Sequence, residues 1–118
     1  MDEGMEHLGK AARTARIAQN EALFREVNEQ IDALNDFGAH LETFGIVCEC
    51  GEATCSDVIT TRRSIYEGVR AFPERFIVRA GHVFPDVESV VETHDDFVVV
   101  AKNPGIAERL AEETDPRS

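Results

Sequence analysis

The chain has 118 residues, and its 23 acidic and 12 basic side chains give a net charge of −11. This length fits a single domain, and the acidic excess argues against general binding to nucleic acid or to anionic membranes. No apolar run reaches the roughly 18 residues that a membrane helix needs. No secretion signal is visible either, so we expect a cytoplasmic protein.

The first ten residues are polar and show no periodicity, which predicts a disordered end at 1–10 before one domain at 11–114. A long helix is predicted at 11–38, because apolar side chains recur there every three or four residues. The positions of this helix seam are Ile17, Asn20, Phe24, Val27, Ile31 and Leu34. Such a seam either packs on the helix's own domain or associates with a second copy as a coiled coil.

The rest of the domain, 44–102, combines short β-type segments with one helical segment. Strands are expected where β-branched and aromatic residues concentrate, at 44–48, 58–60, 75–79, 87–92 and 97–102. Helices are expected at about 61–71 and at 105–113. The predicted fold class is therefore α+β: a long N-terminal helix followed by a small, mostly antiparallel sheet with short helices.

Three cysteines, Cys48, Cys50 and Cys55, occur within eight residues. In a reducing compartment, an odd and clustered set indicates a metal site rather than disulfides. Residues i and i+2 of a strand point the same way, and the turn that Gly51 permits can bring the third thiol to the first two. The C-x4-C spacing is common in zinc sites and the C-x-C spacing is not. Neither matches a ferredoxin, which disfavours an iron–sulfur cluster.

The charges around the thiols favour the same interpretation. Glu49, Glu52 and Asp57 are close to them in sequence, and neighbouring anions raise the pKa of a thiol. That disfavours a reactive thiolate, whereas a divalent cation removes the conflict because it deprotonates the thiols that bind it. The polar residues between the cysteines also argue against three thiols that serve only as small apolar side chains.

A tetrahedral site needs a fourth ligand beside three thiolates. The histidines available are His7, His40, His82 and His94. His82 is favoured because it follows a predicted strand and Gly81, at a loop entry where its ring can turn inward. His40 is the next candidate, followed by water or an acidic side chain. The sequence thus predicts one zinc per chain, bound by the three cysteines and His82, which fixes the strand and turn at 48–55 to the loop at 81–82.

Several stretches resemble a family of small, uncharacterised bacterial proteins, of an actinobacterial type. They are RIAQNEALFREVNEQI at 16–31, CEC at 48–50 with the later Cys55, YEGVRAFPERFIVRAGH at 66–82, and VESVVET and FVVVAK within 87–102. The resemblance implies that Cys48, Cys50, Cys55 and His82 belong to one metal site. It implies no activity.

These features favour a non-enzymatic protein-interaction or regulatory module in which a structural zinc holds the fold and the surface binds another protein. The contact would use the helix seam or the segment 62–79, which has five arginines against two acidic residues. Those arginines either pair with surrounding acids or form a patch for an acidic partner. The alternatives are a zinc-thiolate redox sensor, a catalytic zinc with water as its fourth ligand, and a nucleic-acid-binding regulator, which the net charge disfavours.

Overall fold

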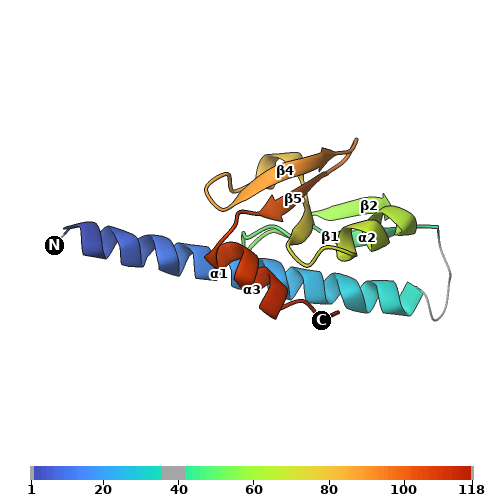
Figure 1. Ribbon diagram of the computed structural model, residues 1–118. Helices are drawn as coiled ribbons and strands as arrows, with labels where there is room; N and C mark the ends of the chain where they lie inside the picture. The colour runs from blue at the N-terminus through green and yellow to red at the C-terminus, as the bar shows by residue number, and fades with distance from the viewer. Residues whose placement is uncertain (1, 36–41, 118) are drawn as a thin grey trace.

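The computed structural model describes residues 2–35 and 42–117, with side chains from Gly9 onward. It confirms the α+β class: a long helix, two small antiparallel sheets and two short helices (Figure 1). Helix α1 (Asp2–Leu34) runs along the length of the molecule, and both sheets lie on one side of it in this view. None of the described helices is both long and apolar enough to cross a membrane.

The first sheet is a hairpin followed directly by a helix. Strand β1 (Thr43–Val47) pairs antiparallel with β2 (Val58–Arg62), so that Val47 lies opposite Val58. Buried and exposed residues alternate along both strands, as expected for a sheet with one face on the core. Helix α2 (Arg63–Arg70) follows without a loop.

The second sheet has the strand order β3-β5-β4, and both of its pairings are antiparallel. Its strands are β3 (Arg75–Val78), β4 (Glu88–Thr93) and β5 (Val98–Lys102). A short 3-10 turn, η2 (Ala80–His82), follows β3, and α3 (Ile106–Glu113) follows β5. The central strand β5 buries three consecutive valines, which form the core together with apolar side chains of β1, β2, β3 and α2.

The face of α1 that packs on the sheets is polar. Beside Ile17, the buried residues of α1 and of the residue after it recur at intervals of three and four: Ala18, Glu21, Arg25, Asn28, Asp32 and Asn35. The predicted helix seam is therefore not the buried stripe. Ile17 is 4% exposed, but Val27 is 36% and Leu34 is 72% exposed.

Specific polar partners explain how such a face can be buried. The Nζ of Lys102 donates hydrogen bonds to Glu21 Oε1 at 2.6 Å and to Glu88 Oε1 at 2.9 Å. Arg25 donates to the carbonyl oxygen of Ala111 at 2.8 Å and stacks over the ring of Phe76, 4.5 Å from its centroid. Buried polar groups are tolerated where they are paired in this way.

The N-terminal end differs from the prediction. Helix α1 begins at Asp2, so residues 2–10, which were expected to be disordered, are helical. Acidic residues in a first turn complement the helix dipole, and the Met, Glu, Leu and Lys of this stretch favour helix. Residues 2–10 extend a helix that already packs on the sheets, and extending an existing helix needs no new nucleation step. The predicted stop near Gly38 lies outside the described residues.

The arginine-rich segment 62–79 is largely paired within the protein. Arg63 Nε lies 3.2 Å from Asp32 Oδ1, and buried Arg70 donates to the carbonyl oxygen of Arg75. Arg75 itself covers the ring of Phe72, 3.9 Å from its centroid. The first of the two arrangements that the sequence allowed, pairing with acids, holds for Arg63 and Arg75, whereas Arg70 also bonds to a carbonyl oxygen.

Candidate metal centre

The segment Cys48–Cys50 joins the two sheets. Beyond β1, Cys48 N donates to Asp57 O at 2.9 Å, which continues the pairing with the chain that leads into β2. On its other side, Glu49 N donates to Ile77 O at 2.8 Å, and Glu49 Oε1 accepts from Ile77 N at 2.9 Å. The cysteine segment therefore lies between the β1–β2 hairpin and β3, where groups from three strands converge.

Helix α1 holds this segment from the other side. Asn28 Nδ2 donates to Val47 O and to Glu49 Oε2, and its Oδ1 accepts from Val47 N, each at 2.8 Å. Asn20 Nδ2 donates to Gly51 O, also at 2.8 Å. A Cβ at Gly51 would overlap the side chain of Ile17, so the close approach of helix and turn requires glycine there.

The four predicted ligands come together. The sulfur atoms of Cys48, Cys50 and Cys55 and one ring nitrogen of His82 all lie within 4.8 Å of one another. His82 Nδ1 is 3.5 Å from Cys48 Sγ and 3.5 Å from Cys55 Sγ. In a tetrahedral zinc site, with Zn–S near 2.3 Å and Zn–N near 2.0 Å, the S···N edge is about 3.5 Å. The two S···N spacings match that edge.

Backbone N–H groups point at the sulfurs. Arg79 N donates to Cys48 Sγ at 3.3 Å, and the backbone of Glu52 and of Asp57 forms a hydrogen bond with Cys50 and with Cys55 respectively. Such bonds favour the charged thiolate. Each of the three thiols that would have to ionise in a metal site therefore has one fixed donor.

The thiols also interact with one another. A hydrogen bond between Cys48 and Cys50 raises the pKa of Cys48 and lowers the pKa of Cys50 to about 5. Burial raises the pKa of Cys55. Nearby acids were predicted to raise the pKa of the thiols, but the pKa of Cys50 is lowered, because its hydrogen bond with Cys48 outweighs burial. The arrangement thus favours a thiolate at Cys50 over Cys48, and a bound cation would neutralise its charge.

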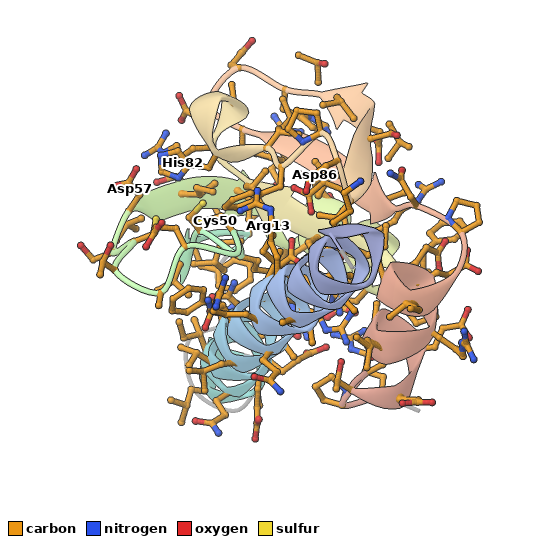
Figure 2. All side chains as sticks on the ribbon, turned by 90° about the vertical axis from the view of Figure 1, so that its left-hand side faces the viewer. Arg13, Cys50, Asp57, His82 and Asp86 are labelled. Atoms are coloured by element: carbon orange, nitrogen blue, oxygen red, sulfur yellow. The ribbon has the colours of Figure 1, made fainter. Side chains whose placement is uncertain are left out.

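Asp57 reaches the histidine rather than the thiols. Its Oδ2 lies 3.6 Å from His82 Nε2, the ring nitrogen on the side opposite the sulfurs. In Figure 2, Asp57 and His82 lie at the outer edge of the molecule and Cys50 lies farther in. A carboxylate on the second nitrogen of a metal-binding histidine sets the ring orientation and increases its basicity. The spacing Cys55-x-Asp57 was the available sequence signal for this role.

The remaining histidines do not join the cluster where the structure describes them. His94 stacks on Phe97, with ring centroids 4.6 Å apart, and lies 3.7 Å from Glu92. His40 falls outside the described residues, and so does the side chain of His7. Among the described histidines, His82 alone lies with the three cysteines.

No protein-family model matches this chain, and neither the curated proteins nor the solved structures searched contain a match. The resemblance to small bacterial proteins therefore stays a prediction. The case for a metal centre rests on the geometry of Cys48, Cys50, Cys55 and His82.

Proposed function

We propose that this protein is a zinc-binding module without enzymatic activity, in which one Zn²⁺ fixes the fold and the surface binds a protein partner. The proposal rests on four candidate ligand atoms that all lie within 4.8 Å of one another. The two distances from His82 Nδ1 to the sulfurs of Cys48 and Cys55 are those expected in a tetrahedral site. Three thiolates and one imidazole form a donor set typical of structural zinc. The residues that would bind the ion are Cys48, Cys50, Cys55 and His82.

The positions of these ligands explain why the metal would stabilise the fold. Cys48 and Cys50 follow β1, Cys55 precedes β2, and His82 ends the turn after β3. One ion therefore crosslinks the hairpin to the second sheet. In zinc-finger peptides such a site provides an apparent binding free energy on the order of 10 kcal/mol, which is large beside the stability of a small domain.

The surface supports a role in protein contacts. Leu23 and Leu34 on α1 are 57% and 72% exposed, and with Val27 they follow a helical spacing on the side away from the sheets. Grouped exposed apolar side chains are typical of interaction sites. Sedimentation of the full chain distinguishes a second copy from another partner. Leu23→Gln combined with Leu34→Gln is expected to abolish the contact and leave zinc binding unchanged.

The proposal is tested by adding zinc to the metal-free protein in the presence of a chromophoric competitor. We expect one equivalent to bind and the thermal midpoint to rise. Cobalt substitution tests the catalytic alternative, because four protein ligands leave no position for water. A cobalt spectrum that small anions do not change supports a closed structural site, and a spectrum that shifts on their addition contradicts it.

A further inference from the structure

We propose that two copies of this chain associate through the outward side of α1, with the two helices antiparallel. The second copy would be the protein partner of the proposed function, on which this dimer rests, but its formation needs no metal. The contact surface is called the outer ridge. It consists of Ala12, Arg16, Gln19, Leu23, Gln30 and Leu34.

The outer ridge is open to solvent along its whole length. All of its side chains are exposed, and Leu23 and Leu34 are 57% and 72% exposed. Their spacings of three, four and seven residues place them in one stripe on the helix. Leu23 lies about half a turn around the helix axis from Glu21 and Arg25, whose side chains are buried. The ridge therefore faces away from the sheets, and another molecule can reach it.

Helix α1 is also longer than the domain that packs on it. Its 33 residues span about 50 Å, and its N-terminal part projects beyond both sheets and α3 (Figure 1). The Cα radius of gyration is 14.7 Å, whereas a compact chain of this length would have about 13.5 Å. A short helical segment that packs on nothing is marginal in water. A second α1 beside the first would cover this projecting part.

The charges along α1 favour a second copy over an unrelated partner. Residues 7–20 contain three basic side chains and no acidic one, whereas residues 26–35 contain three acidic side chains and no basic one. An antiparallel pair places the basic part of each helix beside the acidic part of the other, and it also opposes the two helix dipoles. A parallel pair would bring like charges together. The helix is therefore complementary to itself, as a two-fold interface requires.

The outer ridge allows two acidic proteins to approach each other. The chain has a net charge of −11, but the ridge contains no acidic residue, and Arg16 is its only charge. In an antiparallel pair centred on Leu23, Gln30 of one copy lies level with Arg16 of the other, and Leu34 lies level with Ala12. The guanidinium then meets an amide oxygen that can accept its hydrogen bond. The most exposed leucine meets a small side chain, and the two copies of Leu23 meet at the centre.

The test measures the dissociation constant of the dimer by sedimentation of the full chain as purified. Leu23→Glu places two like charges at the centre of the pair, and we expect dimerisation to weaken at least about 100-fold. Ile106→Glu is the matched control, because Ile106 is also an apolar helix residue, 52% exposed, but belongs to α3. Its dissociation constant should stay within about twofold of the wild type. Circular dichroism checks that both variants keep their helices.

The orientation of the helices is measured with a photo-crosslinking benzophenone residue at position 12. In the antiparallel pair it should attach to the stretch 30–34 of the second copy, which peptide mass spectrometry identifies. A parallel pair would instead join the two copies near position 12.

Three results would overturn the proposal: a wild-type chain that is monomeric at every concentration tested, equal dissociation constants in Leu23→Glu and Ile106→Glu, or a crosslink between the two copies of position 12. Zinc is measured on the same samples, so that the two proposals can fail separately. A dimer without metal supports the helix contact and contradicts the zinc function. A monomer that holds one zinc contradicts the helix contact alone.

Discussion

The side-chain amide of Asn28 in α1 donates a 2.8 Å hydrogen bond to the buried carboxylate of Glu49, the residue between two of the candidate ligands. The same amide bonds to both the N–H and the carbonyl oxygen of Val47. The same side chain therefore both docks the long helix and fixes the geometry of the cysteine segment. A change at either of them is expected to affect the other.

Asn28→Ala tests this link. The substitution removes three hydrogen bonds, a buried one to Glu49 and two partly buried ones to the Val47 backbone. We expect a loss of about 3 kcal/mol in the free energy of unfolding. Asn20→Ala is the control, because it removes a single bond, to Gly51 O, and should cost about 1 kcal/mol. Urea unfolding measures both. Equal losses in the two variants would contradict the special role of Asn28.

Gly51→Ala tests how closely the turn approaches α1. A Cβ at this position would overlap Ile17 and press on Phe84, so we expect destabilisation by about 1–3 kcal/mol. Gly68→Ala is the matched control within α2. Nothing lies within 4 Å of a Cβ there, and alanine favours helix over glycine by up to about 1 kcal/mol. Thermal unfolding should therefore move in opposite directions, and shifts of the same sign would count against this packing.

Asp57→Asn tests the carboxylate behind His82. Loss of that partner is expected to weaken zinc binding by about 10- to 100-fold, because the ring loses its orienting anion. Glu52→Gln removes the same charge nearby, but the Glu52 carboxylate bonds to Thr54 instead, so its zinc affinity should change little. Competition titrations compare the two. Similar affinities would mean that only general charge matters at this edge of the site.

The buried Glu21–Lys102–Glu88 group predicts a pH dependence of stability. Burial, followed by contact with Glu88, raises the pKa of Glu21 well above its ordinary value of 4.5. The folded chain thus keeps a proton that the unfolded chain has already lost. This bound proton stabilises the fold fully at pH values below the pKa that Glu21 has in the unfolded chain. The stabilisation is lost as the pH rises through the higher pKa that Glu21 has in the folded chain.

Glu21→Gln should remove that decline, because the amide keeps an acceptor for Lys102 and does not ionise. Unfolding free energies measured at a series of pH values above 4.5 test this directly. Glu26→Gln, at an exposed position on α1, is the control and should keep the wild-type slope. A wild-type slope in Glu21→Gln as well would show that another group binds the proton.

Local sequence patterns were sufficient for the short elements and for the grouping of the four candidate ligands. The alternation in β1 and β2 reflects one buried face. The strands and the two short helices begin within a few residues of the predicted positions. Cys48 and Cys50 face one point because a strand repeats every second residue. His82 was indicated by its place after a strand and Gly81.

The buried polar face of α1 was not predictable, because its partners are distant in sequence. Glu21 accepts a hydrogen bond from Lys102, Arg25 donates one to the carbonyl oxygen of Ala111, and Asn28 donates one to the carbonyl oxygen of Val47. Without those partners, polar residues at helical spacing indicate a solvent-facing surface. The apolar helix seam was therefore predicted to pack on the domain or on a second copy, and the structure exposes its Val27 and Leu34.

The most direct test of the account is the metal content of the purified full chain, from elemental analysis combined with mass measured under native conditions. If zinc fixes the fold, the purified chain holds one zinc that stays bound until chelation or denaturation. The His82→Ala variant retains less zinc. A chain that carries no metal and unfolds at the same temperature with or without added zinc would contradict the zinc-binding account.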